Sequence, residues 1–254
     1  MKAGTMATLK CNALCMSFDG VQALSDVIVE LPTSGIVAII GPNGAGKTTL
    51  LNVLTGFLRP EAGQVFLGQR ELTGLPAHRI ARLGVARTFQ DLRLISLVSL
   101  LENVLLARPN QKGEKLLHAL FRFGVAAEES KNREAAVRLI RFVGLEGKED
   151  QPAGELSYGQ QKLLTLACCL ATEARILLLD EPVAGVHPEM VSQILALLRK
   201  LRDEGKLVVF IEHDLGAVRQ VADHVIVMDQ GRIIAQGKPN EVLDRPEIIE
   251  AYVG

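Results

Sequence analysis

The chain contains no tryptophan and only two tyrosines among its 254 residues. Proteins that bind single-stranded nucleic acids stack the bases on aromatic side chains, so this shortage argues against such a function. The charges are nearly balanced, with 28 Lys and Arg against 29 Asp and Glu. A dedicated nucleic-acid-binding protein usually carries a basic excess. We therefore expect no nucleic-acid partner.

Long apolar runs are also missing. No stretch reaches the roughly 18 apolar residues that a membrane-spanning helix requires. The first residues, MKAGTMATLKCNAL, lack the apolar segment of a secretory signal. We therefore expect that the chain does not cross a membrane. If it works at a membrane, a partner protein would have to hold it at the surface.

Cysteine is scarce, and its spacing excludes a zinc ribbon. Cys11 and Cys15 are four residues apart, whereas Cys168 and Cys169 are adjacent. The adjacent pair lies in an apolar helical stretch, LLTLACCLA. We expect buried free thiols in a reducing compartment.

The most informative segment that is present spans residues 41–48, GPNGAGKT, which matches the phosphate-loop pattern G-x-x-x-x-G-K-[ST]. An apolar run at 36–40 precedes it and predicts a buried strand; helical spacing follows over 48–55. A strand, a glycine loop and a helix amino terminus together bind anions. The predicted phosphate-binding residues are Gly41, Pro42, Asn43, Gly44, Ala45, Gly46, Lys47, Thr48 and Thr49.

The remaining patterns predict an α/β fold: a phosphate-loop NTPase core with a mostly parallel sheet, an antiparallel β subdomain and a helical insertion. Antiparallel strands are expected within 7–31, and residues 64–72 are expected to form either another strand pair or a strand and a turn. The helical insertion is expected within about 96–160. Further buried strands are expected at 176–179, 207–211 and 225–228. Helices are expected at 76–83, 97–105, 113–123, 128–143 and 190–201, with short ones near 241–243 and 246–252.

Two acids and a histidine follow the later buried strands. Asp180 ends the ILLL run, where a phosphate-loop protein keeps a Mg²⁺-associated carboxylate. Glu181 could polarise an attacking water, although it could also be a solvated turn residue. His213 follows the LVVFI run and could reach a γ-phosphate, although an isolated histidine is more often structural.

A second anion site is predicted at residues 156–162, LSYGQQK. Ser157 is a favourable N-cap for a helix that continues to Ala171. A capped helix terminus with a hydroxyl and a glycine amide can bind a phosphate. An ordinary N-cap explains the local pattern equally well.

In order along the chain, GPNGAGKT, Gln90 within RTFQD, LSYGQQK, ILLLDEP and IEHD resemble the motifs of the ATP-binding subunit of an ABC transporter. The resemblance covers nearly the whole chain and implies one ATPase domain over 1–254. In it, a nucleotide-binding core of about 1–90 and 161–254 would carry a helical subdomain at about 91–160.

The resemblance also implies a role for each matching residue. The residues implied to interact with Mg²⁺ are Thr48, Gln90 and Asp180. Glu181 would be the catalytic base, and His213 would contact the γ-phosphate of ATP. Gln90 would also sense the attacking water. The residues implied to bind the other subunit's ATP are Ser157, Gly159 and Gln160. Phe18, in SFDG, stands where the family places an aromatic side chain against adenine. The alternative for Phe18 is a side chain that only packs in the fold.

Two segments depart from the family pattern. The signature usually reads LSGGQ, and Tyr158 occupies its third position here. The segment after the catalytic glutamate usually reads SALD, whereas this chain has Ala184, Gly185, Val186 and His187. Because Ser157 and Gly159 are retained, we expect ATP clamping to persist.

The resemblance implies that ATP closes a head-to-tail dimer with a second ATP-binding subunit, identical or related. Membrane permease subunits would hold this dimer on the cytoplasmic face of the membrane, and residues near 93–101 would receive a permease helix. LSYGQQ, EPVAG and the RPEIIEAYVG terminus are similar to branched-chain amino-acid importers, which also use a periplasmic solute-binding protein. Urea or amide importers, lipopolysaccharide export and a non-transport ABC ATPase are the alternatives.

Overall fold

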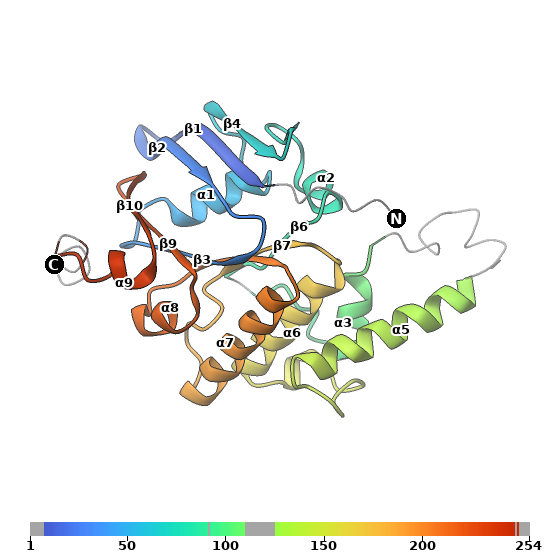
Figure 1. Cartoon of the computed structure of the whole chain (residues 1–254). Helices are drawn as coiled ribbons and strands as arrows, with labels where there is room; N and C mark the ends of the chain where they lie inside the picture. Colours follow the sequence, from blue (N-terminus) through green and yellow to red (C-terminus); the bar gives the residue numbers. More distant parts are fainter. Residues whose placement is uncertain (1–7, 91, 110–124, 247, 249–254) are drawn as a thin grey trace. The chain divides into compact units, whose positions relative to one another are not determined.

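The computed structural model describes residues 8–90, 92–109, 125–246 and 248 (Figure 1). The chain divides into two compact units. The first comprises Met1–Arg87, Arg175–Ala184 and Val191–Gly254, and the second comprises Thr88–Ala174 and Gly185–Met190.

A six-stranded sheet forms the centre of the first unit, in the order β10-β9-β3-β8-β7-β6. All neighbouring pairs are parallel except β9 and β10. The apolar runs predicted β3, β7, β8 and β9. Strands β6 and β10 were not predicted, because β6 has only three residues and β10 (RIIAQG) contains only a short apolar run. The strands are β3 (Gly35–Ile40), β6 (Val85–Arg87), β7 (Ile176–Asp180), β8 (Leu207–Ile211), β9 (His224–Asp229) and β10 (Arg232–Gly237).

An antiparallel sheet belongs to the same unit and confirms the predicted β subdomain. Its order is β2-β1-β4-β5. Helix α1 (Lys47–Leu54) lies between the two sheets (Figure 1), and its apolar side chains join one core with those of both sheets. The strands are β1 (Leu9–Phe18), β2 (Val21–Glu30), β4 (Ala62–Leu67) and β5 (Arg70–Glu71).

Shorter helices complete the first unit. The predicted helices at 76–83, 190–201 and 241–243 are present, although α7 begins in residues assigned to the second unit. Helix α8 was not predicted; the Asp214 carboxylate caps it by accepting from the N–H groups of Gly216 and Ala217. These helices are α2 (Ala77–Arg82), α7 (Pro188–Asp203), α8 (Leu215–Val221) and α9 (Pro239–Val242).

The described part of the second unit is mainly helical. Helices α3 (Leu100–Leu106), α5 (Val125–Phe142) and α6 (Tyr158–Ala171) pack against one another, and a 3₁₀ turn covers Ala153–Glu155. This unit is larger than the predicted subdomain at 91–160, because α6 packs with α3 and α5 and belongs to it entirely. The helix predicted at 113–123 lies outside the described residues, as does most of the one predicted at 246–252.

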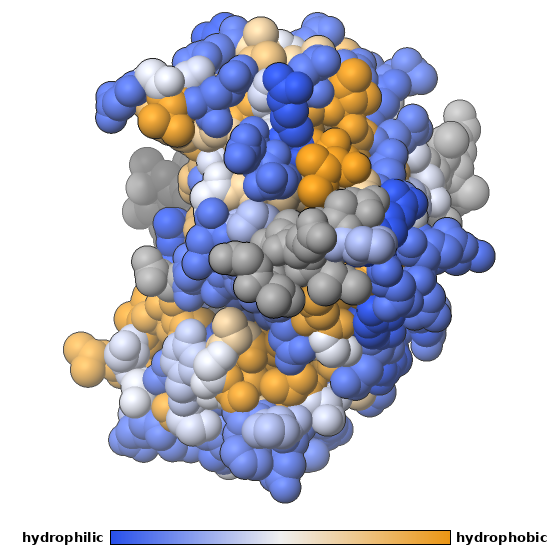
Figure 2. Space-filling model, turned by 90° about the vertical axis from the view of Figure 1, so that its left-hand side faces the viewer, coloured by the Kyte–Doolittle hydropathy of each residue, from blue (hydrophilic) through white to orange (hydrophobic). Residues whose placement is uncertain are grey.

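No helix among the described residues is long and apolar enough to cross a membrane. On the face drawn in Figure 2, hydrophobic residues form patches among hydrophilic ones. All four cysteines are free; Cys11 and Cys169 are buried, whereas Cys15 and Cys168 are partly exposed. Burial raises the pKa of the Cys11 and Cys168 thiols to about 12, so both remain protonated at neutral pH.

Candidate functional site

Three neighbouring parallel strands end at one edge of the six-stranded sheet. In the register of the sheet, Ile39 of β3 pairs with Ile211 of β8, which in turn pairs with Asp180 of β7. Parallel strands expose their carboxyl ends together, and ligands bind at that edge in α/β proteins. The loops after β3, β7 and β8 therefore meet there, and they carry most of the residues predicted for the first unit's site.

The loop after β3 passes very close to its neighbours, and two glycines make this possible. A Cβ on Gly41 would lie 2.0 Å from the Met228 carbonyl oxygen, and one on Gly46 would lie 2.3 Å from that of Ala23. Gly46 has a φ of 94° and precedes α1 as its N-cap. Since glycine has no side chain to cap the helix, the first N–H groups of α1 point out of its amino end, where phosphate oxygens could accept from them.

Lys47 is buried at the start of α1. Its Nζ donates to the carbonyl oxygens of Gly41 at 2.7 Å and Pro42 at 2.8 Å. Burial lowers the pKa of the Lys47 ammonium, and the carboxylates of Glu181 and Asp180 act in the opposite direction by raising it. The ammonium is thus held inside the loop, in the electrostatic field of both predicted acids.

Glu181 and His213 face each other from the ends of β7 and β8. His213 Nε2 lies 3.3 Å from Glu181 Oε1, and both side chains are partly exposed. Glu181 has a φ of 48°, which is a left-handed conformation that non-glycine residues seldom adopt. Such backbone strain concentrates at functional sites. Its N–H is held by the Ile211 carbonyl, so the turn is fixed to β8.

Sequence reasoning assigns no role to Glu212 of IEHD, yet its side chain accepts hydrogen bonds from the loops after β7 and β8. Its side chain is buried; Oε1 accepts from the Val183 N–H at 2.8 Å, and Oε2 accepts from the His213 N–H at 3.3 Å. A charged residue directly after an apolar strand was the available signal. Glu212 thereby joins the segment after Glu181 to the segment that carries His213.

Asp180 is paired with an arginine that sequence reasoning also passed over. Arg87 Nη2 donates to Asp180 Oδ2 at 2.8 Å, and Arg87 Nη1 donates to Asn52 Oδ1 at 2.7 Å. The two charged side chains are 4% and 2% exposed. The signal was again a charge that ends an apolar strand, since Arg87 is the first residue of RTFQD.

Other predicted residues belong to the second unit. Ser157 is the N-cap of α6: its Oγ accepts from the Gln160 N–H, and Gln160 Oε1 accepts from the Ser157 N–H. Gly159 lies in the first turn of this helix, and Gln90 lies in an exposed bend. In the first unit, Phe18 ends β1 with 43% of its surface exposed.

The two segments that depart from the family pattern touch each other. A Cβ on Gly185 would lie 3.3 Å from Cε1 of the Tyr158 ring. The Lys162 ammonium lies 5.3 Å from the centre of the same ring. A Cβ on Gly159 would lie 3.0 Å from Met190 Cγ. The first turn of α6 therefore packs against residues 185–190.

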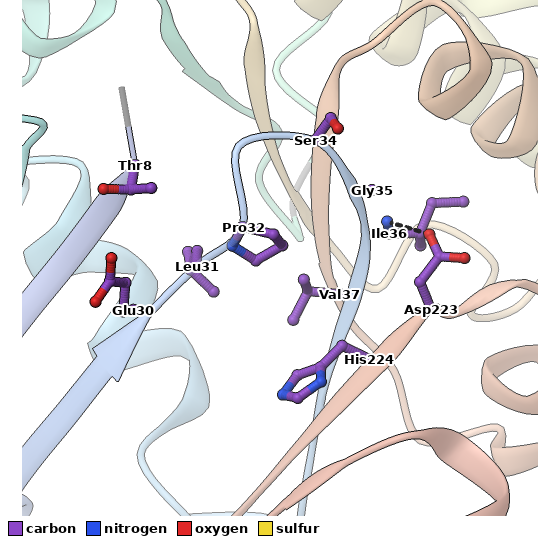
Figure 3. Close-up of a pocket in the computed structure, with 10 residues that line it drawn as sticks. All are labelled: Thr8, Glu30, Leu31, Pro32, Ser34, Gly35, Ile36, Val37, Asp223 and His224. Carbon is purple, nitrogen blue, oxygen red and sulfur yellow. Dashed lines mark hydrogen bonds between the residues drawn. The ribbon is translucent and has the colours of Figure 1, made fainter. Parts of the chain in front are cut away.

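A pocket of about 550 Å³ lies elsewhere on the first unit, around Gly35–Val37 at the start of β3. Asp223 and His224 line it, and Asp223 Oδ2 accepts from the Ile36 N–H at 2.8 Å (Figure 3). These residues lie at the opposite end of β3 from the phosphate loop. Asp223 therefore stabilises the entry to β3 and is separate from the phosphate-loop edge.

Within the described residues, no group of three or more His, Cys, Asp or Glu side chains could hold a metal ion. A metal at the phosphate-loop edge would therefore need ligands beyond acidic side chains. Mg²⁺ typically binds with one or two protein ligands, phosphate oxygens and water. The Thr48 hydroxyl and the Asp180 carboxylate match that requirement chemically.

Comparison with known proteins gives consistent matches. The family described as ABC transporter matches residues 24–184. The chain is 41% identical, over 97% of both chains, to the high-affinity branched-chain amino acid transport ATP-binding protein BraF of Pseudomonas aeruginosa. Its fold is similar, with a TM-score of 0.85, 34% identity and coverage of 98% and 100%, to the ADP conformation of an ATP-binding cassette of an ABC transporter.

A further similar structure is dimeric. It is a post-hydrolysis state of an ATP-binding cassette bound to ADP and Pi, with a TM-score of 0.76 and 25% identity. The match covers 91% of this chain and 98% of that one. The similarity thus extends over nearly the full length of both.

The two backbone hydrogen bonds that the Glu212 carboxylate accepts lead to a stability prediction. Glu212→Gln preserves shape but places an NH₂ group against one of the two N–H donors. A buried donor left without an acceptor costs about 1–3 kcal/mol, so the free energy of unfolding should fall by that amount. Urea denaturation followed by circular dichroism measures it, with the exposed Glu204→Gln as control. Equal stabilities of the two variants would contradict the role of Glu212.

Proposed function

Because this chain belongs to the ABC transporter family, we propose that it is the ATP-hydrolysing subunit of an importer for branched-chain amino acids or a related small polar solute. The observation that carries the ATPase proposal is the position of Lys47, Asp180 and Glu181 at one edge of the sheet, where the strands β3, β8 and β7 end in register and Lys47 is held inside the phosphate loop. The alternatives are a urea or amide importer, a lipopolysaccharide exporter and a non-transport ATPase.

ATP would bind with its phosphates in the loop at residues 41–48. The N–H groups at the start of α1 would donate to phosphate oxygens, and Lys47 Nζ would exchange its two carbonyl partners for the terminal phosphates. Thr48 and Asp180 would hold Mg²⁺, which neutralises phosphate charge when bound. The part-exposed ring of Phe18 would cover the adenine.

Glu181 would accept the proton of the attacking water. Its carboxylate is partly exposed and lies at the end of β7, next to His213. His213 Nε2 would keep this carboxylate oriented and would contact the γ-phosphate. Gln90 would interact with Mg²⁺ and the attacking water, the role that the family resemblance implies for it.

A second ATP-binding subunit would complete the site. The amino end of α6 presents the Ser157 hydroxyl and the Gly159 amide, and a helix terminus of this kind favours anions. These groups, with Gln160, would contact the γ-phosphate held by another subunit. The dimeric cassette with ADP and Pi supports this arrangement. The reciprocal contact gives a two-fold dimer that closes on ATP and opens after hydrolysis.

Residues 95–99 would receive a permease helix at the inner face of the membrane. Leu97 is 93% exposed, and Ile95 is half exposed. Buried Asn103 holds the segment by exchanging hydrogen bonds with the Ile95 backbone and by donating to the Ser99 carbonyl. An apolar side chain presented on a fixed backbone suits an apolar partner surface.

Similarity to BraF is the reason for favouring branched-chain amino acids. A subunit of this kind need not touch the transported solute, so its own site does not select it. A periplasmic solute-binding protein would supply that specificity. The substrate is thus the part of the proposal that rests on relatives alone.

Glu181→Gln tests the catalytic proposal. Glutamine cannot accept the proton, so ATP turnover should fall by about 10²–10⁴-fold while ATP binding persists. The trapped ATP-bound dimer should be visible by size-exclusion chromatography with light scattering. Glu204→Gln is the control and should match the wild type. Turnover by the Glu181 variant within threefold of the wild type would overturn the assignment of the base.

Leu97→Glu tests the docking surface. A charge on this exposed side chain should abolish co-purification with the permease subunits, because the apolar contact would have to bury a carboxylate. Leu106 is also exposed, at the end of α3, so Leu106→Glu is a matched control. The isolated Leu97 variant should retain its ATPase rate. Equal co-purification of the two variants would exclude residues 95–99 as the docking site.

Solute uptake tests the substrate. Deleting the gene should abolish uptake of labelled leucine, and a plasmid copy of the wild type should restore it, unlike one carrying Glu181→Gln. Uptake of urea and of short amides serves as the comparison. If the deletion abolished uptake of urea or an amide and left leucine uptake unchanged, the amino-acid substrate would be excluded. The proposal that the chain is a transport ATPase would stand.

A further inference from the structure

Arg87 connects three elements of the first unit. It ends β6, and its guanidinium reaches Asp180 at the end of β7 and Asn52 on α1. The distances, 2.8 and 2.7 Å, are those of strong hydrogen bonds. Two nitrogens of one rigid fork are used, so the Asp180 carboxylate is fixed relative to α1.

Asn52 and Thr48 lie on one face of α1, because they are four residues apart in a helix. Thr48 is the residue whose hydroxyl would bind Mg²⁺, and Asp180 is the carboxylate that would bind it. The Asn52–Arg87–Asp180 bridge therefore spans the two elements that carry these two oxygen ligands.

We propose that Arg87 is a positioning residue for Mg²⁺: through Asn52 it sets the spacing between the Asp180 carboxylate and the Thr48 face of α1. This inference rests on the proposed function, since it concerns the metal that accompanies the nucleotide. Groups that hydrogen-bond a metal-binding carboxylate orient it, and their loss weakens metal affinity. Mg²⁺ is sensitive to such spacing because it demands near-ideal octahedral geometry.

A simpler role for Arg87 is neutralisation of a buried carboxylate. Any cation that reaches Asp180 would satisfy that role, and Asn52 would be irrelevant to it. Positioning requires the planar fork and its second partner. Lysine is a point charge on a flexible stem and cannot hold both partners in a fixed geometry. Arg87→Lys and Asn52→Ala therefore separate the two roles.

The experiment measures Mg²⁺ binding to the ADP complex, without turnover. ADP affinity is first measured by calorimetry in EDTA, and Mg²⁺ is then titrated into the EDTA-free ADP complex. Asn52→Ala and Arg87→Lys should each weaken Mg²⁺ binding by about tenfold or more. Their ADP affinity in EDTA should stay within about twofold of the wild type, because the loop at 41–48 is unchanged.

Arg219→Met supplies the control, because it removes a surface ion pair with Asp244 in the same unit. It should leave both affinities unchanged. Wild-type Mg²⁺ affinity in Asn52→Ala and Arg87→Lys would overturn the inference and leave neutralisation as the role of Arg87. A wild-type chain that binds no ADP would instead overturn the proposed function itself. Circular dichroism of each variant verifies that it is folded.

Discussion

The parallel hydrogen-bond ladder that joins β3, β8 and β7 is the constraint on which the first unit's site depends. It brings three loops from distant parts of the chain to one sheet edge, although residues 41, 181 and 213 are far apart in sequence. The strands themselves are almost entirely apolar and buried, so their register is set by the core. Core packing therefore brings the three loops to this edge, where Asp180 itself is the last residue of β7.

Burial of charge is the second constraint, and it follows from the first. Strand ends in a packed sheet are poorly hydrated, so each charged group there needs a partner to offset its desolvation. Lys47 uses loop carbonyls, Asp180 uses Arg87, and Glu212 uses two backbone amides. The partners also restrict motion. A site built this way is ordered before ligand binds, which reduces the entropy lost on binding.

Sequence reasoning could find the elements whose signal is local. The apolar runs predicted β3, β7, β8 and β9, and the glycine pattern located the phosphate loop. It could not assign Arg87 to Asp180, because 93 residues separate them and nothing local indicates the pairing. Short edge strand β6 carries too few residues for a period. Sequence reasoning also could not assign α6 to the second unit, because amphipathic periodicity shows that a face is buried but not which neighbour buries it.

The two departures from the family pattern are a single structural feature. Tyr158 replaces a glycine of the signature. Its ring lies next to the position where the usual SALD segment has alanine, so a side chain at that position would crowd the ring. Gly185 occupies that position, where a Cβ would lie 3.3 Å from the ring. Its φ of 73° is also one that glycine adopts without strain. The Tyr158 ring therefore packs against Gly185 and joins the first turn of α6 to this segment. In this chain, the segment that lacks the usual aspartate is held to the signature helix through an aromatic contact within one unit.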